Sequence, residues 1–211
     1  MENISNKYKT IEGVKASEFE EEKSRFITHI KHVETEKEAI DFIEEISNKY
    51  KDATHNCTAY IINETPEIKR YNDDGEPQGS AGLPMLSVLE KEEISNVCAV
   101  VTRYFGGKLL GKGGLVRAYS RGVSETLDKN VIYKRPFYVV ELTYSYTVLG
   151  IIENYINEKG LQVINKDFTD VVKMTLYIRE EDFESISNDL INMTSAEIKI
   201  NNKEAVMLFS I

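Results

Sequence analysis

Two spacings of hydrophobic residues alternate along the chain and predict strands and helices in turn. Apolar and polar positions alternate in SRFITHIKHV (24–33), which predicts a strand. The segment TEKEAIDFIEEISNKY (35–50) predicts a helix, because Thr35 and Glu38 have the spacing of a capping box at its start. Its apolar residues then share one face: Ala39, Phe42, Ile43 and Ile46. A strand at CTAYII (57–62) follows.

The segment between residues 63 and 135 adds a loop, a strand and two helices. Residues 63–79 are polar, contain two prolines and lack periodicity, so they predict a long loop. LPMLSVLEKEE (83–93) predicts a helix entered through Pro84, and VCAVVTRYF (97–105) predicts a buried strand because it is nearly all apolar. A further helix is expected from about 114 to 129, with one face made by Leu115, Ala118, Tyr119, Gly122, Val123 and Thr126.

A second pattern begins after KRPF. It predicts a strand in FYVVELTYS, a helix closed by Gly160, two strands in LQVINKDF and VVKMTLYI, a helix in EDFESISNDLINMT, and a final strand or pair of strands. This βαββαβ order is the ferredoxin-like pattern. The sequence therefore predicts two domains, residues 1–135 and residues 136–211.

Composition and charge restrict the class of protein. Hydrophobic residues at 41% and charged residues at 29% of 211 are ordinary globular values. No apolar run approaches the roughly 20 residues of a membrane span, and no secretion signal begins the chain, so we expect a cytoplasmic protein without membrane contact. Two cysteines and three histidines lack the spacing of a zinc site. The net charge is −9, yet residues 103–135 carry a net +6.

The chemistry of that basic segment centres on residues 106–114, GGKLLGKGG, which we call the glycine loop. It precedes the expected helix at residue 114, and a helix N-terminus offers backbone N–H groups and a positive dipole to anions. It is not a nucleotide-binding P-loop, because Gly113 stands where that motif needs Ser or Thr. The alternative is a tight turn from strand to helix. The candidate anion or nucleic-acid ligands are Arg103, Lys108, Lys112, Gly113, Gly114, Arg117 and Arg121.

Two further motifs offer candidate chemistry. In DDGEP, the carboxylates of Asp73, Asp74 and Glu76 lie within four positions, and oxygen clusters of this kind bind hard cations. The alternative is a structured turn in which the carboxylates accept backbone N–H groups or pair with the basic segment. In THNCTAY, His55 and Cys57 point the same way along a strand, which allows either a thiolate–imidazole pair or a packing and supporting role.

Together the motifs HNCTAY, DDGEPQGSAGLP and VVTRYFGGKLLGKGGLVRAY resemble the IMPACT family in its bacterial YigZ branch. The one departure is Leu83, where the resemblance leads us to expect a basic residue. It implies an α+β fold. The N-terminal IMPACT domain would be ribosomal-protein-like, a mixed sheet with helices and a left-handed βαβ crossover. The C-terminal domain would be ferredoxin-like and similar to the last domain of elongation factor G. Eukaryotic relatives look like translational regulators that act by binding proteins.

Three functional readings follow. The leading one is a non-catalytic binding protein linked to translation or RNA, with RNA or a ribosome-associated factor as partner and no cofactor. The second is a regulator that binds an acidic protein partner without nucleic acid. The third is a metal-assisted enzyme that uses Asp73, Asp74 and Glu76. The sequence leaves the metal, the oligomeric state and any catalysis open.

Overall fold

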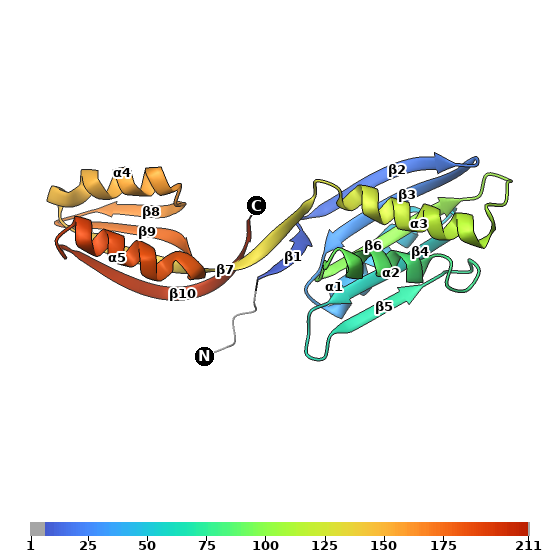
Figure 1. The fold of residues 1–211 in the computed structure, drawn as a ribbon, viewed down its shortest axis with the longest axis horizontal. Coiled ribbons are helices and arrows are strands. Elements are labelled where there is room, and N and C mark those ends of the chain that lie inside the picture. The colour runs from blue at the N-terminus through green and yellow to red at the C-terminus, as the bar shows by residue number, and fades with distance from the viewer. Residues whose placement is uncertain (1–6, 211) are drawn as a thin grey trace. The chain divides into compact units, whose positions relative to one another are not determined.

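The computed structural model describes residues 7–210, which divide into two compact units (Figure 1). We call residues 8–133 the N-terminal unit and residues 134–210 the C-terminal unit. The boundary predicted after residue 135 lies two residues from this division. Each unit has a β-sheet, helices and a hydrophobic core of its own, and the protein is an α+β protein of two domains.

The sheet of the N-terminal unit has five strands. In spatial order they are β2 (Val14–Glu21), β3 (Ser24–His32), β6 (Val97–Tyr104), β4 (His55–Ile62) and β5 (Ile68–Asn72). Each neighbouring pair is antiparallel, whereas the bridge between Lys9 of β1 (Tyr8–Ile11) and Ile94 is parallel. The expected βαβ crossover corresponds to β3, the helix α1 (Glu36–Lys49) and β4, because β3 and β4 run parallel on either side of β6.

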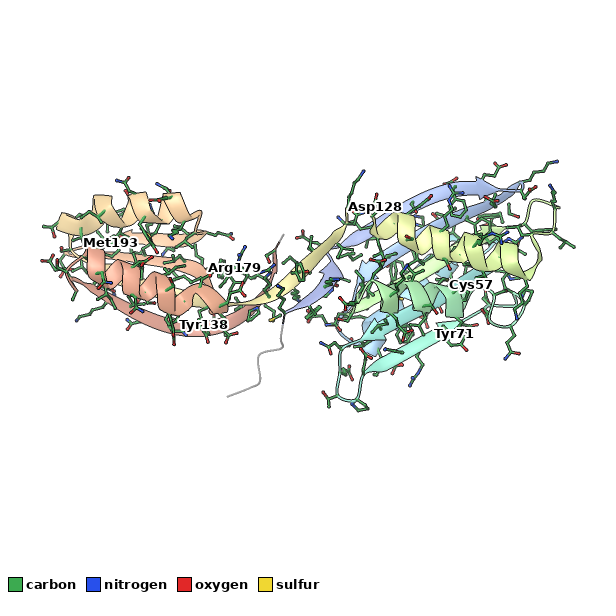
Figure 2. All side chains as sticks on the ribbon, in the orientation of Figure 1. Cys57, Tyr71, Asp128, Tyr138, Arg179 and Met193 are labelled. Carbon is green, nitrogen blue, oxygen red and sulfur yellow. The ribbon has the colours of Figure 1, made fainter. Side chains whose placement is uncertain are left out.

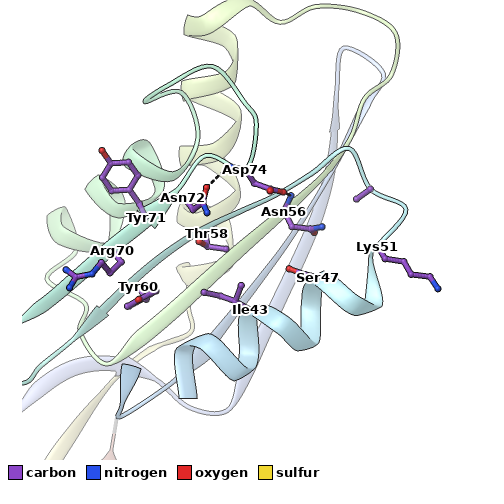
Figure 3. A pocket seen from close by; sticks show the side chains of 11 residues that line it. Ile43, Ser47, Lys51, Asn56, Thr58, Tyr60, Arg70, Tyr71, Asn72 and Asp74 are labelled. Atoms are coloured by element: carbon purple, nitrogen blue, oxygen red, sulfur yellow. Dashed lines mark hydrogen bonds between the residues drawn. The ribbon is translucent and has the colours of Figure 1, made fainter. Parts of the chain in front are cut away.

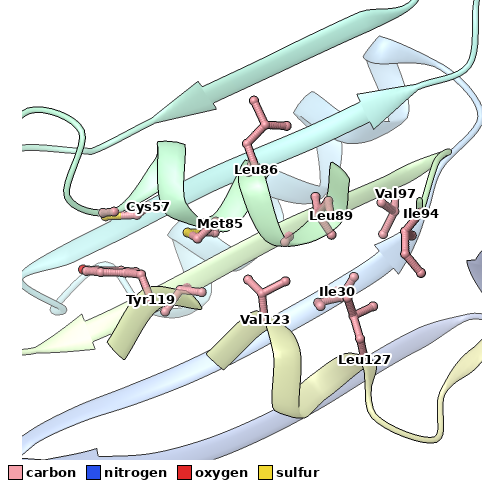
Figure 4. Packing of buried hydrophobic residues seen from close by; sticks show 14 of the residues in the cluster. Ile30, Cys57, Met85, Leu86, Leu89, Ile94, Val97, Tyr119, Val123 and Leu127 are labelled. Atoms are coloured by element: carbon pink, nitrogen blue, oxygen red, sulfur yellow. The ribbon is translucent and has the colours of Figure 1, made fainter. Parts of the chain in front are cut away.

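Helices cover both faces of this sheet. Alternate residues of β4 and β6 point to opposite faces, as a pleated strand requires. Tyr60, Ile62, Cys98 and Val100 pack against α1, while the intervening residues pack beneath α2 (Gly82–Lys91) and α3 (Gly111–Leu127). Figure 4 shows this second layer, in which Met85 and Leu89 of α2 and Tyr119 and Val123 of α3 meet over the sheet.

The structure corrects several predicted elements. The predicted loop at residues 63–79 is wrong, because it contains β5, whose exposed polar residues conceal a strand paired with β4. The sequence patterns also did not predict β1 and β2. The helix expected from 114 starts at Gly111, and the glycines at its start hid that turn. The face predicted for this helix is confirmed, since all six of its residues are buried.

The C-terminal unit has the predicted ferredoxin-like order. Its elements are β7 (Val131–Tyr144), α4 (Leu149–Lys159), β8 (Val163–Phe168), β9 (Val172–Arg179), α5 (Phe183–Met193) and a single final strand, β10 (Ile198–Ser210). The spatial order is β8, β9, β7, β10, and α4 ends at Gly160 in the left-handed conformation, as predicted. Figure 2 shows the side chains on these elements, with Arg179 at the end of β9.

No helix within residues 7–210 combines the length and the apolar character that crossing a membrane would take.

Candidate anion-binding site

The glycine loop follows β6 and includes the first residues of α3, and its first glycine is fixed by a close backbone contact. A Cβ on Gly106 would lie 1.9 Å from the carbonyl oxygen of Lys23, in the turn between β2 and β3, so only glycine fits there. Gly107 and Gly111 have φ angles of 82° and 68°, in the left-handed region that favours glycine. The glycines are therefore needed for the path of the loop, as the structural alternative predicted.

The helix α3 begins at Gly111, within this loop, and its first three residues are exposed. The residue before the helix is Leu110, whose side chain cannot accept a hydrogen bond, and the first turn has no acidic residue. The first N–H groups of a helix have no partner within the helix. Within residues 7–210 no side chain caps this end, where Lys112 and Gly113 are exposed, so this end of α3 keeps its attraction for anions.

Three of the predicted cations line one cavity of about 350 Å³ beside the loop. They are Lys108, Arg117 and Arg121, and the cavity also contains Gly114, Leu109, Leu110, Glu21 and Glu22. Two of these cations already have partners. Lys108 pairs with Glu22, while Arg121 bonds Glu125 at 2.7 Å and Glu21 at 3.4 Å. Within residues 7–210, neither Arg117 nor Lys112 forms an ion pair, so these two are free for a ligand.

Arg103 differs from the other predicted anion ligands, because its side chain is buried within the N-terminal unit. Its side chain is 5% exposed and points into the unit, where Nη1 donates to Oε1 of Glu76 at 2.7 Å. Nη2 donates to the hydroxyl of Ser24 at 3.2 Å, and that hydroxyl also accepts from the N–H of Gly106. The aromatic rings of Phe26 and Phe105 flank the guanidinium. Arg103 therefore links the DDGEP turn to the glycine loop from beneath and is screened from an external phosphate.

Glu76 collects several groups from distant parts of the chain. Besides Arg103, the phenol of Tyr119 in α3 donates to Oε1 of Glu76 at 2.8 Å. The imidazole of His55 lies close by, with Nε2 at 3.9 Å from the same oxygen, and its Nδ1 donates to the carbonyl of Asp74 at 2.7 Å. Burial raises the pKa of Tyr119, and Cys57 and Glu76 add to the effect, so the phenol stays protonated. The cluster is a buried ion pair with a fixed donor beside it.

The other two carboxylates of the turn hold backbone groups. Asp73 accepts three N–H groups, from Gly79 at 2.8 Å, Ala81 at 3.0 Å and Gly82 at 2.9 Å, at the start of α2. Asp74 accepts the N–H of Asn56 at 2.6 Å. The three carboxylates thus have separate partners, which agrees with the structured turn predicted as the alternative to a metal site. Across residues 7–210, no three His, Cys, Asp or Glu side chains are grouped to hold a metal ion.

Cys57 is fully buried and supports the same turn. Its thiol donates to the carbonyl of Asp73 at 3.0 Å. Burial raises the pKa of this thiol strongly, with Glu76 and Asp74 adding to the effect, so the thiolate form is suppressed. The geometry and the protonation state match the supporting role predicted for His55 and Cys57 and not a thiolate–imidazole pair.

A second hollow, of about 540 Å³, lies between α1 and the strands β4 and β5 (Figure 3). Its walls are mostly amide and hydroxyl groups, including Asn56, Thr58 and Asn72. Asp74 is the one predicted site residue among its lining residues, and its carboxylate is turned toward the backbone of Asn56. This hollow therefore does not bring the predicted cations together.

Sequence reasoning missed the residues that complete the site. Glu21 and Glu22 reach the cations from the β2–β3 hairpin, which the hydrophobic pattern did not reveal. Ser24 lies 79 residues from Arg103, and no local signal links them. The acidic run SEFEEEKS at 17–24, opposite in charge to the glycine loop, was the available clue to this pairing.

Comparison with known proteins gives consistent matches over both units. The model named Impact N-terminal domain matches residues 22–127, and the one named Domain of unknown function (DUF1949) matches residues 142–197. The Bacillus subtilis protein named IMPACT family member YvyE is 41% identical over 202 residues, 95% of this chain and 93% of the relative. The Escherichia coli protein named IMPACT family member YigZ is 37% identical over 149 residues, 69% of this chain and 73% of the relative.

A solved structure titled as the crystal structure of a hypothetical protein is also similar. It is 30% identical in sequence, with a TM-score of 0.59, and the match covers 95% of this chain and 99% of that chain.

Proposed function

Because the chain belongs to the IMPACT family, we propose that it is a non-catalytic binding protein linked to translation or RNA, which holds phosphate groups at the glycine loop. The cavity beside α3 carries the proposal, since it combines three cations with an uncapped helix N-terminus. Phosphate oxygens accept bonds from both kinds of donor. Arg117 in the cavity and Lys112, which lies outside it in the first turn of α3, make the first contacts, because neither has an ion-pair partner among residues 7–210.

The buried network supports this role by fixing the donors. Arg103, Ser24 and Gly106 form a chain of hydrogen bonds that holds the start of the loop. Tyr119, one turn before Val123 on the buried face of α3, is anchored to Glu76. A site whose donors are fixed beforehand loses less entropy when the ligand binds.

A specific observation favours a second candidate, a regulator that binds an acidic protein without nucleic acid. The carboxylates of Glu22 and Glu21 already rest on Lys108 and Arg121, so this surface accepts carboxylates in the geometry a partner would offer. Leu109, 86% exposed, lies among these cations and gives an apolar contact that a phosphate backbone does not use. The two candidates share the cations and differ in their dependence on RNA.

The test measures binding of a fluorescein-labelled 20-nucleotide RNA hairpin to the full chain between 50 and 200 mM salt. Arg117→Gln and Lys112→Gln are expected to weaken binding, and each lowers the slope of log K against log salt by about 0.7 to 0.9. Lys129→Gln, an exposed cation at the other end of α3, is the matched control. An affinity that is independent of salt and of both variants contradicts the phosphate proposal.

A pull-down with and without nuclease separates the two candidates. A partner that is lost after nuclease treatment and recovered with added RNA favours nucleic acid. A partner that stays bound after nuclease and is released by Arg117→Gln favours the acidic protein.

A further inference from the structure

The sheet of the C-terminal unit is covered by helices on one face. Even-numbered residues of β7 and β9, such as Leu142 and Met174, are fully buried against α4 and α5. The odd-numbered residues between them are partly or wholly exposed. Since successive residues of a strand point to opposite faces, the odd positions form the second face of the sheet, and no element of residues 134–210 buries it. We call this second face the open face.

The strand β10 adds to the open face from the edge. Its even-numbered residues Ile198 and Ile200 pack into the core below α4 and α5. Lys203 has the other parity, and its Nζ lies 2.8 Å from the carboxylate of Glu141 on β7, which places both on the open face. Lys199 shares the parity of Lys203 and is exposed.

The charge of the open face is opposite to that of its surroundings. Residues 134–210 contain eight Lys and Arg and twelve Asp and Glu, so the unit as a whole is acidic. The open face has Glu141 and Asp167 as its carboxylates, against five cations: Lys173, Arg179, Lys199, Lys203 and Arg135, the last of which is paired with Glu181. Among residues 7–210, Lys173, Arg179 and Lys199 have no ion pair. The open face is therefore a net positive surface on a negative unit, complementary to a polyanion.

Aromatic side chains lie among these cations on the two central strands. Phe137 of β7 and Tyr177 of β9 meet edge to face, with ring centroids 6.4 Å apart and an interplanar angle of 78°. Arg179 is directly opposite Phe137 in the strand register. The three side chains line part of a hollow of about 410 Å³ at this end of the sheet, which Lys159 of α4 and Asp182 and Ser185 at the start of α5 also line. Rings and guanidinium planes beside a basic track are the groups that bind unpaired bases.

We propose that the open face binds single-stranded nucleic acid, with a base against Tyr177 or Phe137 and the phosphates along Arg179, Lys173 and Lys199. Duplex RNA fits less well, because its bases are stacked inside the helix and cannot reach side chains on a sheet. The inference uses a different unit and different residues from the glycine loop. It holds or fails independently of the function proposed above, although both ligands contain phosphate.

The test uses the full chain and a fluorescein-labelled decauridine, with anisotropy read between 50 and 200 mM salt. Tyr177→Leu and Phe137→Leu keep an apolar side chain on the sheet, and each is expected to weaken binding by about tenfold. Arg179→Gln and Lys173→Gln lie at the surface and spare the core, and each is expected to lower the salt slope by about 0.7. Thermal melts confirm that each variant is folded.

Matched controls come from the same unit. Tyr146→Leu removes the aromatic ring of a residue that is 49% exposed beyond the end of β7, where its hydroxyl donates to the carbonyl of Thr169. Lys166→Gln removes a cation that pairs with Glu153 of α4 on the helix side. Both are expected to bind decauridine as the unmodified chain does.

Three results would overturn the inference. The first is no binding at 50 mM salt. The second is binding that Lys112→Gln and Arg117→Gln abolish while all four open-face variants leave it unchanged, since the oligonucleotide would then lie on the glycine loop. The third is competition by polyglutamate as strong as that by unlabelled decauridine, which would assign the face to an acidic protein.

Discussion

The guanidinium of Arg103 and the carboxylate of Glu76 form a buried ion pair, with 2.7 Å between Nη1 and Oε1 and side-chain exposures of 5% and 3%. The pair joins the DDGEP turn to the end of β6, and the phenol of Tyr119 donates a hydrogen bond to the same carboxylate. Removing one partner of such a pair leaves the other charge buried without compensation. Its contribution is therefore best tested by removing one residue and then both.

Glu76→Ala is expected to lower the free energy of unfolding by about 3–5 kcal/mol, because Arg103 keeps its charge in an apolar setting. The double variant Glu76→Leu with Arg103→Met removes both charges and is expected to regain much of that loss. Urea unfolding followed by circular dichroism measures both. A double variant less stable than Glu76→Ala would contradict this expectation, because it would show that the ion pair stabilises the fold more than the apolar side chains that replace it.

A second prediction concerns acid. His29 is 7% exposed on the sheet beneath α1. Its Nδ1 has no hydrogen-bond partner among residues 7–210, and its Nε2 lies 3.5 Å from the phenol oxygen of Tyr50. Burial lowers the pKa of His29, Lys49 lowers it further, and Glu45 opposes this. At a pH below the ordinary histidine pKa of 6.5, His29 binds a proton in the unfolded chain but stays neutral in the folded chain. The free energy of unfolding therefore falls as the pH falls toward the lowered pKa of His29.

The expected slope from this residue is at most about 1.4 kcal/mol per pH unit. Urea titrations at pH 8 and pH 5 of the unmodified chain and of His29→Phe isolate it by difference. Equal losses of stability between the two pH values in both proteins would exclude His29 as the source.

Glycine substitutions should have opposite signs at two positions of the glycine loop. Gly106→Ala places a methyl group against the carbonyl oxygen of Lys23, so the loop must move and both stability and ligand binding are expected to fall. Gly113 lies in the first turn of α3, and a Cβ there meets only Nη1 of Arg117 at 3.7 Å. Gly113→Ala is therefore expected to raise stability by up to about 1 kcal/mol. Thermal melts compare the two, and a destabilised Gly113→Ala would contradict this account.

Both thiols are expected to be unreactive in the folded protein. Cys57 and Cys98 are fully buried, and burial raises the pKa of each. At pH 8 a disulfide reagent such as DTNB should label neither cysteine in the native chain and both in urea. Rapid labelling of Cys57 in the native chain would revive the thiolate–imidazole reading.

The local sequence predicted the elements whose apolar residues are periodic. The capping box of α1 is an example: the hydroxyl of Thr35 accepts the N–H of Glu38, although the Glu38 carboxylate reaches back to the N–H of Glu34 instead of Thr35. The strand β5 was missed because all but its first residue are exposed, so it lacks the alternation that marks a strand. A strand without alternating buried and exposed residues gives no hydrophobic pattern from which its sequence could predict it.

The site shows the same limit in its charges. The sequence placed five cations in one segment, and three of them do share a cavity. The charge of a residue does not show whether its side chain points inward or outward. Arg103 points inward because it bonds Glu76, 27 residues earlier, and Ser24, 79 residues earlier, beneath the loop. Such contacts depend on how β3, β4 and β6 align, which is a property of the whole sheet.

Because Gly106 packs against the carbonyl of Lys23, the length of the β2–β3 hairpin determines the position of the neighbouring glycine loop. Adding or deleting one residue in that turn would shift the platform on which the loop rests, and with it the spacing between Lys108 and the start of α3. Changes in ligand preference between related proteins can thus arise in a hairpin that contributes no donor of its own.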